Sequence, residues 1–332
     1  MTTHTARRTH GRALVALVTV LTLAAVASGC GLKAASQFVP AAGPGSIKPT
    51  DSLEGVDVSV GSKDFTEQLI LGKITVIALT VAGANVTDQT NIQGSNSARR
   101  ALERNSINMY WEYTGTSWIS YNQQTKPIAS KKKMWQAVKK ADAKQGIVWL
   151  PPADLNDTYA MAIRDEAAKK LDVQTLSDMA KLPPKELTFC VESEFASRND
   201  GLVGMLKHYG IPLGKKVPRD QVKTMGTGVV YTQTDKGTCN FGEVFTTDGR
   251  IKALGLTVLK DDKHFFPSYN VALNVNEQWY KQHSQITKTI APIRRKLTNQ
   301  MMVNLTEKVD VEGQDPALVA RDWMVKEGFI TK

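Results

Sequence analysis

The stretch Val56-Asp57-Val58-Ser59-Val60 decides the fold class, because apolar and polar side chains alternate along it. Alternation with a period of two is typical of a strand that buries one face. Residues 67–82 follow with apolar side chains at helical spacing. A strand followed directly by a helix is the pattern from which α/β proteins are built.

The same pattern recurs toward the C-terminus. Residues 107–111, 159–163 and 187–191 are strand-like, and helical spacing is found over residues 131–144, 167–170, 176–181, 201–209, 276–304 and 316–328. Strands that alternate with helices predict an α/β architecture with mostly parallel sheets.

Pro151-Pro152 interrupts this pattern and indicates a crossover between two domains. We expect lobe one over residues 56–155 and 270–332, and lobe two over residues 156–269. Two Rossmann-like lobes joined by a two-strand hinge would hold a ligand in the cleft between them, at the carboxyl ends of the strands.

Residues 1–29 are typical of a signal peptide. An arginine-rich start (residues 7–12) precedes an apolar run over residues 13–27. About fifteen such residues are too few to span a bilayer, which takes roughly twenty. Ala27-Ser28-Gly29 before Cys30 is similar to a lipobox, although Leu is more usual than Ala27 at its first position. We therefore expect export and lipid anchoring through Cys30 on the extracytoplasmic face of the cell membrane. The alternative is a plain cleaved signal with Cys30 incidental.

Residues 30–55 are expected to form a tether without a packed element, since residues 41–50 are rich in Gly and Pro.

The two other cysteines are Cys190 and Cys239. In an exported protein, two such thiols are a candidate disulfide. The alternative is a pair of buried free thiols.

Several function classes are disfavoured by composition. The formal net charge is +10, but the basic residues are spread along the chain, and the run Lys131-Lys132-Lys133 indicates a solvated helix face rather than a nucleic-acid site. The sequence contains no Walker or Rossmann glycine loop and no G-x-S-x-G elbow. The five histidines are scattered, which argues against a metal site. Glu192 and Glu194 are more typical of loop or wall residues than of a catalytic pair. We therefore expect neither an enzyme nor a cofactor.

Several segments carry a family resemblance. They are GSKDFTEQ (61–68), YWEYTGT (110–116), NDTYA (156–160), ESEFASR (192–198), GEVFTTD (242–248) and FPSY (266–269). In order and spacing they resemble the osmoprotectant-binding proteins of the glycine betaine/choline ABC importers, which have the type II periplasmic-binding-protein fold. The resemblance implies an ABC permease and its ATPase subunits as partners, a monomeric protein, and membrane contact only through the lipid anchor.

The resemblance also implies a binding site for a quaternary-ammonium osmolyte such as glycine betaine. An ammonium without N–H groups is recognised by aromatic faces, each contributing about 0.5–2 kcal/mol. Most of the family has tyrosine at the position of Phe245. The implied aromatic cage is Tyr113, Tyr159, Phe245 and Tyr269; the carboxylate clamp is Lys63, Thr116 and Arg198; and Asp157 and Glu194 border the cation or brace the clamp.

Other interpretations stay open. In a choline or other cationic-amine binding protein, Lys63 and Arg198 would bind no ligand carboxylate. An enzyme on the same fold would need a nucleophile or metal site, and a fixed envelope domain would bind no small molecule.

Overall fold

The computed structural model describes residues 38–126, 128 and 130–332. The predicted signal peptide, the lipobox and Cys30 lie outside the described residues. The described chain forms one compact unit with two five-stranded sheets and a two-stranded one. No helix of the described part is long and apolar enough to cross a membrane.

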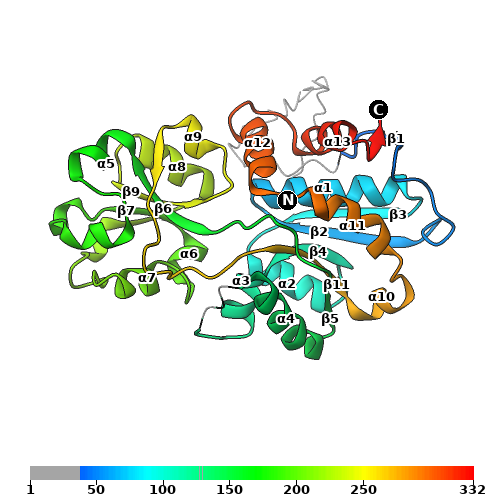
Figure 1. Ribbon diagram of the computed structural model, residues 1–332, viewed down its shortest axis with the longest axis horizontal. Coiled ribbons are helices and arrows are strands. Elements are labelled where there is room, and N and C mark those ends of the chain that lie inside the picture. Colours follow the sequence, from blue (N-terminus) through cyan, green and yellow to red (C-terminus); the bar gives the residue numbers. More distant parts are fainter. Residues whose placement is uncertain (1–37, 127, 129) are drawn as a thin grey trace, which may run out of the picture. The chain divides into compact units, whose positions relative to one another are not determined.

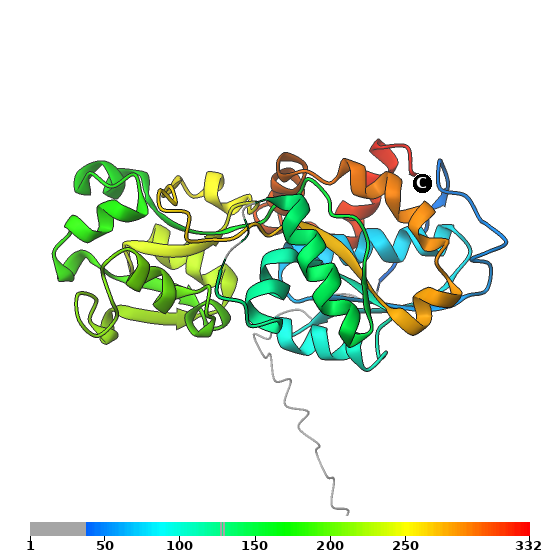
Figure 2. The same cartoon turned by 60° about the horizontal axis from the view of Figure 1, so that its bottom comes forward.

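Lobe one is built on the sheet of order β3-β2-β4-β11-β5 (Figure 1). Helix α1 is apolar on nearly all sides, because it lies between this sheet and the helices α11–α13. Figure 2 shows α2 and α4 in front of the sheet. The strands are β2 (Asp57–Lys63), β3 (Asn85–Ile92), β4 (Met109–Tyr113), β5 (Ile147–Trp149) and β11 (Val271–Asn276); the helices are α1 (Thr66–Val81), α2 (Ser95–Glu103), α3 (Thr114–Thr116), η1 (Ser117–Tyr121), α4 (Lys131–Asp142), η2 (Ala143–Gln145), α10 (Glu277–Gln282), α11 (Ile286–Lys296), α12 (Asn299–Asp310) and α13 (Pro316–Lys326).

Lobe two is built on the sheet of order β10-β6-β9-β7-β8. Its core includes the stacked rings of Phe189 and Phe241, whose centroids lie 5.4 Å apart. The strands are β6 (Tyr159–Arg164), β7 (Phe189–Glu192), β8 (Val222–Met225), β9 (Phe241–Phe245) and β10 (Leu256–Val258); the helices are α5 (Asp165–Leu171), η3 (Leu176–Lys181), η4 (Pro184–Glu186), α6 (Ser193–Ser197), α7 (Leu202–His208), η5 (Arg219–Gln221), α8 (Thr227–Asp235) and α9 (Arg250–Ala253).

The expectation of mostly parallel sheets is wrong, because both sheets are mixed. Strand β2 is parallel to β3 and β4, whereas β11 is antiparallel to β4 and β5. In lobe two β7 is parallel to β8 and β9, whereas β6 is antiparallel to β9 and β10. Strands β6 and β11 enter their sheets directly from the hinge. Each begins beside the end of its neighbour, as the pairs Tyr159–Phe245 and Val271–Tyr113 show, and therefore runs in the opposite direction.

The hinge consists of two antiparallel chain segments, which confirms the two-lobed α/β architecture. Asn156 and Asn270 form a bridge between them, and the Val271 N–H donates to Leu155 O at 3.1 Å. Asn299 on α12 holds the outgoing segment by hydrogen bonds to the Asn156 backbone N–H and carbonyl, at 2.8 and 2.9 Å. The boundaries of the lobes stay a prediction.

The expectation that residues 30–55 form no packed element is wrong for residues 43–55. Strand β1 (Gly43–Pro44) pairs with β12 (Ile330–Thr331), and the side chains of Ile47 and Leu53 are buried in the main core. A Cβ at Gly45 would lie 2.7 Å from backbone atoms of Phe329 and Ile330. Glycine at this position therefore permits close packing against the C-terminus, rather than chain flexibility.

The structure contains the predicted disulfide. Cys190 on β7 and Cys239, just before the adjacent strand β9, are bonded, with their Cα atoms 5.6 Å apart. Both side chains are fully buried, so the alternative of two free thiols is wrong.

We expect the double variant Cys190→Ala/Cys239→Ala to lower the free energy of unfolding by about 4 kcal/mol, because the bond closes a loop of roughly 50 residues in the unfolded chain. Urea denaturation measures this change. The wild-type protein unfolded in reductant should approach the same midpoint, and an unchanged midpoint in both samples would contradict the prediction.

Candidate functional site

The predicted cage residues meet where the hinge strands enter the two sheets. Tyr113 ends β4 and Phe245 ends β9, whereas Tyr159 begins β6 and Tyr269 directly precedes the bridge residue Asn270. The Tyr159 ring lies at the centre, with its centroid 5.3 Å from that of Phe245 and 5.6 Å from that of Tyr269. Tyr159 and Phe245 are half-buried.

Phe65 is an aromatic residue of this site that our sequence interpretation missed. Its ring stacks on Phe245 at 5.0 Å and lies 6.0 Å from the Tyr113 ring, so it joins the aromatic residues of the two lobes. Phe65 is the N-cap residue of α1, with extended backbone angles that turn it away from the helix axis. Phe65 lies within the motif GSKDFTEQ, so the motif could have identified it as a residue of the site.

Glycine in the motif YTGT has a steric reason. A Cβ at Gly115 would lie 2.5 Å from Cδ1 of Tyr269. Only glycine allows the Tyr269 ring to pack this closely against the turn after β4. The motifs near residues 115 and 269 are therefore two sides of one contact.

The hydroxyl groups of the two buried cage tyrosines already form hydrogen bonds with side chains of the protein. Tyr113 donates to Glu67 at 2.8 Å and accepts from Gln68 at 3.0 Å. Tyr269 donates to Asp200 at 2.6 Å. Burial raises the pKa of both phenols well above the usual value, so both remain neutral donors.

Lys63 of the predicted clamp forms a buried ion pair. Its Nζ lies 2.7 Å from Oε1 of Glu112 and 5.0 Å from the centroid of the Tyr113 ring. Glu112 also accepts from the Tyr110 and Tyr121 hydroxyls at 2.7 and 3.0 Å. Sequence interpretation missed Glu112 as the partner, because the pairing depends on β2 and β4 being neighbours in the sheet.

Arg198 and Glu194 connect the two lobes. The Arg198 guanidinium binds Asp200 through two nitrogens, each at 2.7 Å, and lies 3.0 Å from Glu194 and 3.4 Å from the Thr116 hydroxyl. Glu194 accepts from the Ser95 N–H of lobe one at 3.0 Å. Burial alone would raise the pKa of Glu194, but Lys63, Arg198 and this N–H outweigh burial and lower it.

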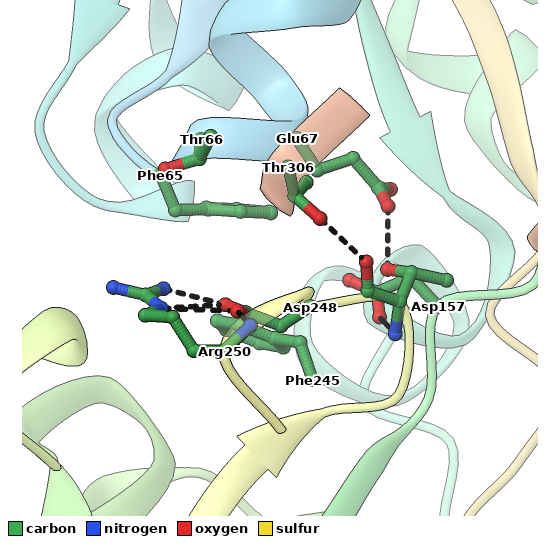
Figure 3. A pocket seen from close by; sticks show the side chains of 9 residues that line it. Phe65, Thr66, Glu67, Asp157, Phe245, Asp248, Arg250 and Thr306 are labelled. Atoms are coloured by element: carbon green, nitrogen blue, oxygen red, sulfur yellow. Dashed lines mark hydrogen bonds and ion pairs between the residues drawn. The ribbon is translucent and has the colours of Figure 1, made fainter. Parts of the chain in front are cut away.

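A small pocket lies beside the rings of Phe65 and Phe245 (Figure 3). Glu67 from α1 and Asp157 from the hinge also line it, and Thr247 contacts both. The Thr247 hydroxyl donates to Glu67 at 2.6 Å, and its N–H donates to Asp157 at 3.4 Å. Burial raises the pKa of Glu67 to about 7 and that of Asp157 well above its usual value. Asp157 therefore lies at the predicted place, with an acidic neighbour, Glu67, that sequence interpretation missed.

Glu243, in the middle of β9, is a further buried acid. Its Oε2 accepts from the Glu192 N–H at 2.9 Å, whereas Oε1 has no hydrogen-bond partner among the described residues. Burial raises the pKa of Glu243 to about 8. This carboxyl group is therefore neutral at neutral pH, close to the charges of Glu192, Glu194 and Arg198.

The structure thus gathers every predicted cage, clamp and supporting residue around the junction of the two lobes. Their roles toward a ligand stay predictions.

Known proteins are similar to this chain over most of its length. Residues 56–326 match the family described as the substrate binding domain of the ABC-type glycine betaine transport system. The glycine-betaine-binding protein of Pseudomonas aeruginosa is 38% identical over 273 residues, which cover 80% of this chain and 86% of that protein. The ergothioneine transport permease/ergothioneine binding protein EgtU of Helicobacter pylori is 30% identical over 85% of this chain, but only 49% of its own length is covered. Among solved structures, a glycine betaine/carnitine/choline ABC transporter superposes with a TM-score of 0.67 at 28% identity, covering 83% of this chain and 99% of that one.

We expect Glu243→Gln to become more stable relative to wild type as the pH rises from about 5 to about 8.5. The carboxyl group ionises near its ordinary pKa of 4.5 in the unfolded chain, whereas burial raises its pKa in the folded protein to about 8. Between these values wild-type stability declines with pH, and the variant lacks this decline. Melting temperatures across the range measure the difference. Glu312→Gln, an exposed control, should track wild type, and a Glu243→Gln difference that is constant with pH would contradict the assignment.

Proposed function

Because the chain belongs to the family of substrate-binding domains of ABC-type glycine betaine transport systems, we propose that its aromatic residues capture the quaternary ammonium of glycine betaine or a related osmoprotectant. The chain is a substrate-binding protein of an ABC importer for betaine-type ligands, not an enzyme. The observation that carries the proposal is the continuous set of rings contributed by both lobes, from Tyr113 through Phe65, Phe245 and Tyr159 to Tyr269.

The chemistry of these rings suits such a ligand. A trimethylammonium group offers no N–H donor, so it is attracted by ring faces rather than by hydrogen-bond acceptors. The buried hydroxyls of Tyr113 and Tyr269 are held by Glu67 and Asp200, which fixes the orientation of both rings. A preoriented ring loses little side-chain entropy when the ligand binds.

Capture by both lobes explains how binding would be signalled to the importer. A ligand that contacts rings of both lobes favours the arrangement in which the lobes are together. Hydrogen bonds between the lobes support that arrangement, from Thr247 to Glu67 and from Ser95 to Glu194. We propose that the ligand-loaded form docks on an ABC permease driven by ATPase subunits.

A choline-type ligand without a carboxylate is a second candidate, and the state of the predicted clamp favours it. Lys63 is paired with Glu112, and Arg198 is paired with Asp200 and Glu194. A ligand carboxylate would have to share these cations with carboxylates of the protein. A ligand that is only cationic needs no such sharing.

We further propose that the mature protein is anchored by a diacylated Cys30 at the extracytoplasmic face of the membrane and acts as a monomer. The signal-like leader and the lipobox-like residues 27–30 support the anchor.

Tyr113→Ala and Tyr159→Ala should each weaken binding of glycine betaine and choline about tenfold or more, because each removes a cation–π face. Isothermal titration calorimetry measures the affinities. Tyr280→Ala on α10 serves as the control, and it should bind as wild type does. Unchanged affinity in both cage variants would place the cage elsewhere.

Titration of Arg198→Lys distinguishes the two ligand classes. Lysine keeps the charge but loses the forked geometry that binds a carboxylate. If Arg198 binds the ligand carboxylate, glycine betaine should lose about tenfold more affinity than choline, the worth of one charge-assisted hydrogen bond. Equal losses for both ligands would favour the choline-type interpretation.

A further inference from the structure

The charges that line the pocket of Figure 3 do not balance. Its one basic residue, Arg250, is bound by Asp248, with Nε at 3.0 and 3.2 Å from the two carboxylate oxygens. Glu67 and Asp157 are only 3% and 5% exposed, and neither forms an ion pair within the described part of the chain. Two buried carboxyl groups are therefore left without a cation.

A single residue holds these two carboxyl groups at one place. Glu67 accepts from the Thr247 hydroxyl and Asp157 from the Thr247 N–H. Two buried acids this close oppose each other's ionisation, and their protons are lost in steps that belong to the pair. The raised pKa of Asp157 follows from its burial first and from the charge of Glu67 second.

Among the described residues, the surroundings of the pair supply no other neutralising charge. Tyr113 on β4 donates a hydrogen bond to Glu67, and Lys63 on β2 is held by Glu112. The remaining titratable or charged groups around the pair are Asp248 and Arg250, which bind each other, and Asp310 on α12, which lies 3.5 Å from Arg250.

The same pocket wall carries aromatic rings. Phe65 and Phe245 stack on each other and line the pocket together with Glu67 and Asp157. A ligand cation that reached the pocket side of these rings would therefore lie beside the acid pair. A neutral pair gives it little electrostatic stabilisation, whereas an ionised pair attracts it strongly in a buried site.

We propose that Glu67 and Asp157 together hold a proton that a quaternary-ammonium ligand displaces to solvent on entering the cleft, so that ligand capture is coupled to proton release. This inference rests on the proposed function. No bond of the ligand changes, and the positive charge that enters replaces the positive charge that leaves.

The direction of the pH dependence follows. Because the cation favours the ionised pair, it lowers the pKa of the pair in the complex, and affinity rises with pH. Below the pKa of the free pair, Kd increases about tenfold for each unit by which the pH falls, as expected for one displaced proton. Above it, Kd becomes constant.

Calorimetric titration of the full chain with choline and with glycine betaine tests the coupling. Neither ligand changes its charge between about pH 5.5 and about pH 8.5. At each pH the titration is run in two buffers of different ionisation enthalpy, because a released proton adds the heat of buffer protonation. We expect release of about one proton near pH 6, falling toward none at the upper end.

The double variant Glu67→Gln/Asp157→Asn identifies the groups responsible. Both acids are replaced, because the burial that chiefly raises the pKa of Asp157 persists when Glu67 alone is changed. We expect this variant to bind with nearly constant Kd between about pH 6 and about pH 8.5 and with equal heats in the two buffers. Glu312→Gln, at an exposed position, is the matched control and should keep the wild-type slope.

The outcomes separate the inference from the proposed function. Binding with a pH-independent Kd and equal heats in wild type would overturn the inference and leave the proposed function standing. A wild-type slope that persists in Glu67→Gln/Asp157→Asn would assign the proton to another group, such as Glu243, and would also overturn it. Absence of binding at every pH would overturn both.

Discussion

The antiparallel entry of the two hinge strands determines where the binding residues lie. Because β6 and β11 start at the hinge beside the ends of β9 and β4, the start of one strand and the end of its neighbour share one edge of each sheet. Tyr159 is thereby placed opposite Phe245, and Tyr113 opposite Val271, two residues after Tyr269. The aromatic set follows from this topology, since four residues far apart in sequence become neighbours at two strand pairings.

The second constraint is that a buried charged side chain needs a partner of opposite charge. It applies to the charged residues near the hinge. Removing a single partner from a buried ion pair typically costs 3–5 kcal/mol. Lys63 with Glu112, and Arg198 with Asp200, satisfy this requirement within lobe one and lobe two respectively. What remains uncompensated is acidic, namely Glu67, Asp157 and Glu243. A site whose basic groups are already paired and which retains unpaired acids is suited to a cation, in agreement with its aromatic walls.

Local sequence patterns predicted the strands and helices better than they predicted which strands and side chains pair with one another. The alternation at 56–60 and the apolar spacing at 67–82 are properties of short segments, so β2 and α1 were predictable. The mixed sheets were not, because strand direction depends on the hinge. The pairing of Lys63 with Glu112 likewise requires the register of two strands, which no local pattern contains. Residues 43–55 resemble a linker by composition, yet Gly45 packs against Phe329 and Ile330 at the far end of the chain. The motif-based residues Tyr113, Tyr159, Phe245 and Tyr269 did converge, since the family resemblance carries such long-range information.

Phe245 acquires a physical meaning from these two constraints. A tyrosine, which the family resemblance implies at this position, would provide the same ring face together with a hydroxyl on the wall of a pocket that already holds two carboxyl groups. A hydrogen-bond donor there would stabilise the ionised acid pair and lower its pKa. Phenylalanine keeps the stacking on Phe65 while leaving the pair to be stabilised by the ligand cation itself. If the acid pair is coupled to the ligand as proposed, phenylalanine at this position keeps the ring face of the cage and leaves the ionised pair to be stabilised by the cation.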